Sequence, residues 1–586
     1  MSLPVRGVAL VAAALVSVPS VATAAGPAPA PGSRTTAGRA AGITWEDCGR
    51  GLQCGELTVP LDHARPDTGT ITLRLARRPA EDQAHRVGSI FTSPGGPGLA
   101  VPDQVGQMAD KLGPEVRKRF DVVGLATRGA DASCTAAGED PDLPGGGVVF
   151  PATADEQRVR LTVDGRQRAL CAKGAPQLLD HMSTADAARD LDLARAALGD
   201  ERLTYYGTSY GTYLGQTYAA LFPDKVRAMV LDGVIDPVEW STGRDRGTLR
   251  PLTERLGSHL GAKEALEAAF AECERVGAAR CPSAATVRQD WADLVAATER
   301  GPVALGDGRE LRYDELHSTV LRALYSADQI PGVLTTIHDL RAALPARIPS
   351  RAMLAAPRAR KKATAALKQL HALARAAEAT SPAAQEVPID PRPQPGVDRR
   401  PGVVPPGLHG PRPTTTPTRR PTPAPRPTAT PTTPPSKEAS YWVGYSGVLC
   451  SDAVNPSDPQ EWVSAAERAK AAAGGFGPLW TWASSVCAGW PGKATGVYRG
   501  PFDKATSTPV LIVANQHDPS TPYAGAAAYR RTLPTSRLVT VKDGFGHGSL
   551  HGYSACVDKT VTAYLTTQET PAADVTCTPD KALFAR

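Results

Sequence analysis

The chain has 586 residues, of which 41% are hydrophobic and 21% are charged, so it is long enough for two domains or for one large domain with insertions. Its formal net charge is +6, but residues 388–436 alone contain seven Arg and only two Asp, and the remainder is close to neutral. This balance argues against a nucleic-acid partner. The basic segment is either a solvated charge run or a contact with an acidic cell surface.

The first residues have the three parts of a secretory signal peptide. Arg6 precedes an apolar run, 7–18, that is too short to span a bilayer, and Ala22-Thr23-Ala24 has the small-x-small pattern of a cleavage site. A buried N-terminal helix is the alternative. We expect residues 1–24 to be a signal peptide and the mature protein to be secreted, since no later apolar run is long enough to be a membrane span.

The next part of the chain alternates between strand-like and helix-like patterns. Residues 25–42, rich in Ala, Pro, Gly and Thr, are expected to be disordered. Strand-like runs follow up to "VRAMVLDGV" at 226–234, with an amphipathic helix that begins at Ser183 or Thr184 as its N-cap. Strands alternating with helices predict a mostly parallel α/β sheet that is covered on both faces.

The pattern changes after residue 236. Residues 250–380 are Ala-rich with helical periodicity, whereas 386–438 is a low-complexity Pro/Thr/Arg tract that cannot bury a core. Two strand-like runs, "TPVLIVANQH" and "SRLVTV", return near the end. We therefore expect an α/β core in two parts, 43–236 and 500–586, interrupted by a helical cap at 237–499 that includes the disordered tract.

All ten cysteines lie beyond the predicted signal peptide, and an even number in an exported chain favours disulfides over metal sites. No C-x-x-C pair occurs, and neither a metal nor an organic cofactor is implied. The simplest connectivity joins neighbours in the sequence: Cys48–Cys54, Cys134–Cys171, Cys273–Cys281, Cys450–Cys487 and Cys556–Cys577.

A G-x-S-x-G motif occupies residues 207–211, between a strand-like run and a helix-like run. This spacing is used where a serine stands on a tight strand-to-helix turn at the edge of a sheet. Ser209 is therefore the candidate nucleophile.

A serine nucleophile needs a base within hydrogen-bond reach and an acid that orients the base. In a doubly wound hydrolase these follow later in the chain, at the ends of later strands. Asp518 follows the strand-like "PVLIVANQH", and His547 lies in "GFGHG" after "RLVTV". Asp543 and Asp558 compete with Asp518 as the acid, but Asp543 lies very close to the histidine in sequence.

The catalytic serine also needs an oxyanion hole. The N–H group of Tyr210, the residue after the serine, supplies one donor, and the loop after an early strand supplies the other. "SIFTSPGGPG" fits that loop, and the N–H of Gly96 is the favoured donor because Pro94 and Pro97 have none.

These motifs resemble secreted tripeptidyl aminopeptidase-like α/β-hydrolases, which are related to the proline iminopeptidase family of serine peptidases. The resemblance covers most of the chain outside the Pro/Thr tract, and the 205–237 stretch is its most specific part. It rests on "PGGPG" at 94–98, "FDVVGLATRGA" at 120–130, "MSTADAARDLDLARAALG" at 182–199, "YYGTSYGTYLGQTYAALFPDKVRAMVLDGVIDP" at 205–237, "VLCSDAV" at 448–454, "ANQHDPSTP" at 514–522 and "GFGHG" at 544–548.

The resemblance implies an α/β-hydrolase fold with Ser209 as nucleophile, Asp518 as acid and His547 as base. It also implies that cap carboxylates hold the substrate's amino group. Glu315 and Asp452 are candidates for this role, although a surface or helix-capping acid is the favoured interpretation of each. Leu99-Ala100-Val101, where the family has Gly-Ser-Gly after its GGPG, is a departure that could alter activity.

Three functions follow from these residues. The first is a secreted serine aminopeptidase that releases short peptides of the tripeptidyl type from free N-termini. The second is a carboxylesterase or other ester hydrolase with the same triad, since this fold serves many acyl groups. The third is a catalytically silent cell-surface binding protein. The sequence does not indicate an oligomeric state.

Overall fold

The computed structural model describes residues 42–98, 101–130, 132, 148–245, 249–305, 309–344, 357–380, 437–549 and 552–585. These residues belong to the second of two units into which the chain divides, Met1–Ala41 and Gly42–Arg586. The predicted signal peptide and residues 25–41 lie outside the described residues, as do residues 386–436 of the Pro/Thr tract. Residues 437 and 438, predicted to belong to the tract, begin a helix instead.

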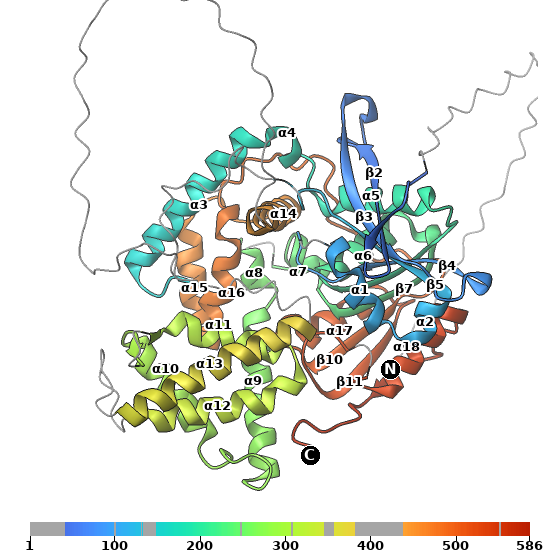
Figure 1. Ribbon diagram of the computed structural model, residues 1–586. Helices are drawn as coiled ribbons and strands as arrows, with labels where there is room; N and C mark the ends of the chain where they lie inside the picture. The colour runs from blue at the N-terminus through green and yellow to red at the C-terminus, as the bar shows by residue number, and fades with distance from the viewer. Residues whose placement is uncertain are drawn as a thin grey trace, which may run out of the picture. The chain divides into compact units, whose positions relative to one another are not determined.

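A ten-stranded sheet runs through the unit (Figure 1). Its strands lie in the order β1-β2-β3-β5-β4-β6-β7-β10-β11-β12; the pairs from β1 to β5 are antiparallel and all later pairs are parallel. The mostly parallel sheet predicted from the sequence is thus confirmed. The strands are β1 (Glu46–Gly49), β2 (Leu52–Pro60), β3 (Thr70–Arg78), β4 (Gly88–Ser93), β5 (Phe120–Leu125), β6 (Leu203–Ser209), β7 (Val226–Val234), β10 (Leu511–His517), β11 (Arg537–Phe545) and β12 (Val575–Cys577).

Helices cover both faces of the sheet because successive strand residues point to opposite sides. Tyr206 and Val230 pack in one buried cluster with helices α1, α2 and α18, whereas Tyr205 and Leu231 pack in another with α5, α6 and α17. The bounds of these helices are α1 (Val101–Lys111), α2 (Pro114–Arg119), α5 (Thr184–Ala197), α6 (Tyr210–Leu221), α17 (Tyr523–Thr532) and α18 (Ala555–Thr567).

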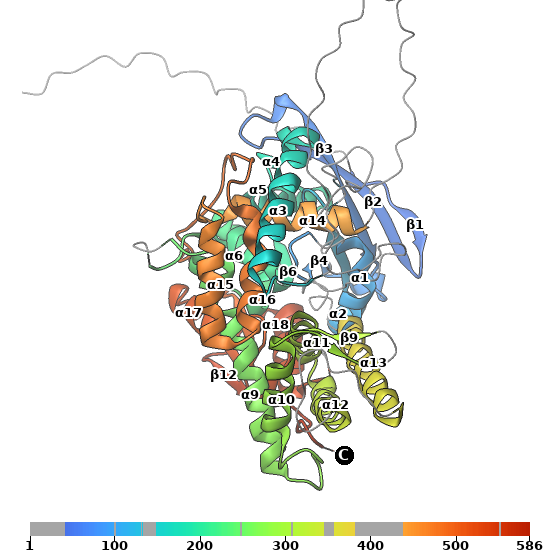
Figure 2. The ribbon, with the colours of Figure 1, turned by 90° about the vertical axis from the view of Figure 1, so that its left-hand side faces the viewer.

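Between β7 and β10 the described residues are mostly helical, as the periodicity predicted. The second cluster of buried side chains continues from the sheet into these helices. Figures 1 and 2 show that α3 (Ala154–Gly174) and α4 (Pro176–Leu179), from the first part of the chain, lie beside these helices. The remaining elements are α7 (Pro237–Ser241), α8 (Leu252–Arg255), α9 (Ser258–Val276), α10 (Val287–Glu299), β8 (Val303–Ala304), β9 (Glu310–Leu311), α11 (Tyr313–Leu324), α12 (Ile330–Ala343), α13 (Pro357–Thr380), α14 (Lys437–Asp452), α15 (Gln460–Ala473) and α16 (Phe476–Thr481).

Four predicted disulfides are present: Cys48–Cys54, Cys273–Cys281, Cys450–Cys487 and Cys556–Cys577. The fifth predicted pair includes Cys134, which lies outside the described residues. Within the described ranges, no helix is both long enough and apolar enough to cross a lipid bilayer.

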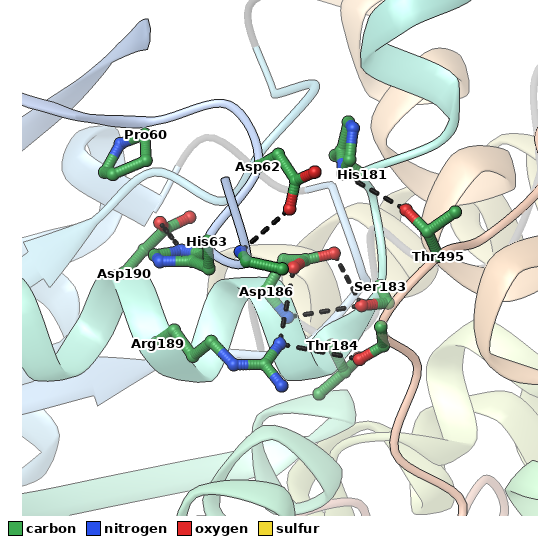
Figure 3. A network of polar contacts seen from close by, with 12 residues as sticks. Pro60, Asp62, His63, His181, Ser183, Thr184, Asp186, Arg189, Asp190 and Thr495 are labelled. Carbon is green, nitrogen blue, oxygen red and sulfur yellow. Dashed lines mark hydrogen bonds and ion pairs between the residues drawn. The ribbon is translucent and has the colours of Figure 1, made fainter. Parts of the chain in front are cut away.

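A buried polar network fixes the start of α5 against the sheet. Ser183 is the N-cap and accepts a hydrogen bond from the N–H of Asp186, as Figure 3 shows next to the His63–Asp190 contact. Arg128, 1% exposed, donates to both carboxylate oxygens of Asp190 at 2.6 and 2.8 Å. This two-pronged pair anchors α5, which packs directly against α6 behind the candidate serine.

Candidate active site

The G-x-S-x-G motif forms the tight turn that its spacing predicted. Ser209 ends β6 and precedes α6, with φ 56° and ψ −126°, a conformation that costs free energy in a non-glycine residue. A Cβ atom at Gly207 would lie 2.4 Å from the carbonyl oxygen of Gly211, and one at Gly211 would lie 2.4 Å from that of Ser93. Only glycines fit these two positions, and they allow the helix to begin immediately after the strand.

Asp518 and His547 follow the ends of β10 and β11 and contact each other. Nδ1 of His547 lies 2.8 Å from Oδ2 and 3.0 Å from Oδ1 of Asp518, and both residues are 2% exposed. The carboxylate also accepts hydrogen bonds from the N–H groups of Ser520 and Thr521 and from the Thr521 hydroxyl. With Nδ1 facing the carboxylate, Nε2 is the ring nitrogen that can exchange a proton with a substrate.

The two other acids considered for this role lie elsewhere. Asp543 is exposed within β11, and Asp558 lies in the first turn of α18, where its carboxylate accepts from the N–H of Gly552. The histidine contact therefore distinguishes Asp518 from both.

The ring of His547 lies against the end of the strand next to that of Ser209. A Cβ atom at Gly233 would lie 3.1 Å from Cε1 of the ring, so the ring packs directly on the main chain of β7. Since β6 and β7 pair in parallel with Ser209 opposite Val234, the histidine and the serine share one edge of the sheet.

Ser209 and Gly96 line the same small cavity, about 50 Å³ in volume. Gly96 belongs to the loop after β4, as predicted for an oxyanion donor, and Tyr210 is the first residue of α6. The cavity is otherwise walled mostly by apolar side chains, including Trp240, Leu256, Leu449 and Trp480. Of the described residues lining it, Asp236 is the sole carboxylate, and sequence patterns did not single it out.

A larger cleft, about 1270 Å³, is bordered by His547 and Thr208. It extends between α1, α9 and the C-terminal residues 578–585. Charged side chains of both signs line it, among them Lys111 and Glu272. The sheet edge that carries the serine and the histidine is thus flanked by a confined cavity and an open cleft.

The loop that carries Gly96 packs tightly against the main chain of α14. A Cβ atom at Gly98 would lie 2.5 Å from the backbone nitrogen of Tyr445, which itself lines the Ser209 cavity. Leu99 and Ala100, where the sequence departs from the family pattern, lie outside the described residues. The cavity therefore forms between the sheet edge and a helix from far along the chain.

The two carboxylates predicted to hold a substrate amino group do not line this cavity. Glu315 lies in the first turn of α11 and forms an ion pair with His371 at 2.9 Å. Asp452 is buried at the end of α14, where it accepts from the N–H and hydroxyl of Thr184 and from the Trp240 indole. Burial raises the pKa of Asp452 to about 6.

Among the described residues, no group of three or more His, Cys, Asp and Glu side chains could hold a metal ion. The described side chains and N–H groups at this sheet edge can supply a nucleophile, a base, an acid and hydrogen-bond donors.

Comparisons with known proteins agree with this fold. Residues 93–252 match the family model described as alpha/beta hydrolase fold, and residues 471–577 match the one described as TAP-like protein. The chain is 29% identical to a tripeptidyl aminopeptidase of Streptomyces lividans over 571 residues, which covers 94% of this chain and 89% of that protein. The first match contains Ser209, and the second contains Asp518 and His547.

Two mycobacterial relatives extend the comparison. Serine protease Hip1 of Mycobacterium tuberculosis is 32% identical over 299 residues, 47% of this chain and 53% of that protein. Carboxylesterase B of the same organism is 27% identical over 551 residues, 90% of this chain and 87% of that protein.

The fold, the motifs and these relatives define the chain as a serine hydrolase of the α/β-hydrolase class. Within that class it is similar to tripeptidyl aminopeptidases and to the TAP-like family model, which is the resemblance that the sequence motifs indicated.

Proposed function

We propose that the protein is an exported serine aminopeptidase that releases short peptides, of the tripeptidyl type, from free N-termini. One observation carries this proposal: Ser209 stands on a strained turn, in a cavity with Gly96, at the sheet edge that holds the Asp518–His547 pair. The names of the relatives support the peptide substrate. The predicted signal peptide and the disulfides support export.

In this mechanism Oγ of Ser209 forms a bond to the scissile carbonyl carbon while His547 accepts the hydroxyl proton. The C–N bond then breaks, and His547 returns the proton to the departing amine. A water molecule, deprotonated by the same ring, hydrolyses the acyl ester and releases the short peptide. Asp518 holds the ring and stabilises the imidazolium that forms in each half of the reaction.

The N–H groups of Gly96 and Tyr210 stabilise the oxyanion of each tetrahedral intermediate. Loss of one such donor costs about 3 kcal/mol of transition-state stabilisation. The helix α6 that begins at Tyr210 adds its positive N-terminal dipole end to the same region.

The two spaces at the site fit the two parts of an aminopeptidase substrate. The confined, mostly apolar cavity beside Ser209 lies where the acyl part binds, and with a volume of about 50 Å³ it would have to widen to receive a whole short peptide. The departing amine must face His547, so the open cleft that this residue borders gives room for the rest of the chain.

Asp236 is the carboxylate that we assign to the substrate's amino group. It lines the cavity, is 8% exposed, and serves as the N-cap of α7 through the N–H groups of Val238 and Glu239. Its other carboxylate oxygen pairs with Arg244. The ammonium group of an incoming substrate would donate a charge-assisted hydrogen bond to the Asp236 carboxylate.

Ester hydrolysis is the second candidate function. The relationship to carboxylesterase B and the apolar walls of the cavity favour it. Such an enzyme would use the same serine, histidine and oxyanion donors but would need no carboxylate for an amino group.

The test compares wild type and Ser209→Ala on arylamides of free tripeptides, on their N-acetylated forms and on short aryl esters. We expect serine-dependent cleavage of the free tripeptides only. Serine-dependent cleavage of esters alone would replace the proposal with the esterase, and equal rates in wild type and Ser209→Ala would refute both.

A second comparison tests the amino-group site. Asp236→Asn retains the N-cap, since Asn caps helices as well as Asp does, but it removes the charge. We expect KM for free tripeptides to rise at least about tenfold, as for a lost hydrogen bond to a charged group. Glu315→Gln is the matched control and should leave KM unchanged; the opposite pattern would move the role to Glu315.

A further inference from the structure

The turn that carries His547 is held by two buried polar side chains from neighbouring strands. Asn515 lies on β10 and is 1% exposed, and Asp232 lies on β7 and is 0% exposed. Neither residue lines the Ser209 cavity. Their contacts are instead with the main chain on both sides of the histidine.

Asn515 holds the turn through its carbonyl groups. Its Nδ2 donates to the oxygens of Phe545, Gly546 and Gly548 at 3.3, 3.0 and 3.1 Å. Two of these residues precede His547 and one follows it, so a single amide group spans the histidine. An aspartate at this position would have no hydrogen atoms to give to three carbonyl oxygens.

Asp232 holds the turn two residues after the histidine. Its Oδ2 accepts from the N–H of Ser549 at 2.8 Å and from the Tyr206 hydroxyl at 2.9 Å, and its Oδ1 lies 3.0 Å from Oγ of Ser549. Because the carboxylate is fully buried, these contacts are what offsets the cost of removing it from water.

The two side chains are joined to each other through Ser549. Oγ of Ser549 lies 3.2 Å from Oδ1 of Asn515 as well as 3.0 Å from Asp232. On the opposite side, the N–H of His547 donates to the carbonyl of Tyr325 at 3.0 Å. Main-chain groups before, at and after His547 are therefore bonded to residues outside the turn.

We propose that Asn515 and Asp232 are positioning residues that hold the catalytic histidine by its main chain, as Asp518 holds it by its ring. This proposal rests on the proposed function, since it requires His547 to be the base. A displacement of about 1 Å at a reacting group can lower a rate by about 100-fold, so the fixed turn has a direct consequence for kcat. Neither residue lines the cavity beside Ser209, so KM for a tripeptide arylamide should be unaffected.

We call the contacts of Asn515 and Asp232 with the turn around His547 the clamp. The test uses Asn515→Asp and Asp232→Asn, which keep side-chain volume and remove some of these hydrogen bonds. We expect kcat for the free tripeptide substrate to fall by about 100-fold in each, with KM within about twofold of wild type. The rate of Ser209 labelling by a fluorophosphonate, which also needs the base, should fall in parallel. The double variant should lose less than the product of the two single losses, because both act on one turn.

Asp121→Asn is the matched control. Asp121 is a buried carboxylate, 4% exposed, that likewise accepts from a main-chain N–H, that of Ala80 at 2.8 Å. It lies near the start of β5, whereas Ser209 is the last residue of β6, so the two lie at opposite ends of the parallel strands. Its replacement should lower stability to urea but leave kcat of the folded enzyme unchanged.

Three outcomes would overturn the proposal. One is a kcat in Asn515→Asp and Asp232→Asn that matches Asp121→Asn while Ser209→Ala is inactive; the proposed function would then stand and the clamp would not. Another is full activity in Ser209→Ala, which removes the function and the clamp together. If either clamp variant fails to fold, Ser549→Ala removes only the joining hydroxyl; an unchanged kcat there refutes the clamp, and a loss of about tenfold at constant KM supports it.

Discussion

Asp452→Asn tests the role of the buried carboxylate that the sequence offered as a substrate anchor. Asp452 is 1% exposed and accepts hydrogen bonds from Thr184 and Trp240, and Trp240 lines the Ser209 cavity. Asn has nearly the same volume, so the substitution removes the charge without opening a cavity. If the carboxylate is a support for the cavity wall, the change should appear in stability and its pH dependence.

The expected size follows from the pKa of this group. Burial raises the pKa of Asp452 from 3.8 to about 6, so between these values the folded protein keeps a proton that the unfolded chain has released. Its contribution to the free energy of unfolding therefore falls as the pH rises through this window, and it is lowest above about pH 6. A shift of about two pH units corresponds to about 3 kcal/mol. Asn carries no such proton, and the variant lacks this dependence.

The assay is urea unfolding of wild type and Asp452→Asn from about pH 4 to about pH 7. The free energy of unfolding of wild type minus that of the variant should fall by about 3 kcal/mol over this range and then stay level. A difference that does not change with pH would refute the reasoning. A rise of more than about tenfold in KM for free tripeptides, with a flat stability difference, would instead make Asp452 the amino-group anchor.

Three further predictions concern positions that support the site without belonging to the proposed catalytic residues. Gly211→Ala would place a Cβ atom 2.4 Å from the carbonyl oxygen of Ser93, so we expect at least about 2 kcal/mol of destabilisation, measurable as a lower urea midpoint. Removing the Cys450–Cys487 disulfide, which joins residues 37 apart, should cost about 4 kcal/mol by the same measurement, and no loss would contradict its role in holding α14. Arg128→Lys keeps the charge but loses the two-pronged contact with the aspartate on α5; about 3 kcal/mol should be lost, and a wild-type midpoint would count against the network.

Much of the candidate site could be predicted because its signals are local. The glycines around Ser209 indicate a tight turn by their chemistry alone, and the strands at 203–209 and 226–234 are visible as short apolar runs. The neighbour-to-neighbour disulfides are also local, and four of the five predicted pairs are present. Such features depend on a few consecutive residues and survive in any fold that contains them.

The residues that sequence patterns missed act across the sheet. Asp232 is one polar residue within the apolar run "MVLDGV", whereas Asn515 is the first of three polar residues that end the strand "LIVANQH". A buried polar residue inside such a run is a signal in itself, but its partner cannot be named before the strand order is known. The same holds for Asp236 and Trp240, which line the cavity together with Tyr445 and Leu449 of the distant helix α14.

The sequence by itself determined many of the strands and helices, the tight turn at Ser209 and the order of Ser209, Asp518 and His547 along the chain. Each of these follows from periodicity or from backbone restrictions within a short window. Only the tertiary structure decided that β10 pairs with β7, across all the helices between them, and so that Asp518 rather than Asp543 meets His547. Pairing between distant strands depends on which buried faces fit together, and that is a property of the whole packed core.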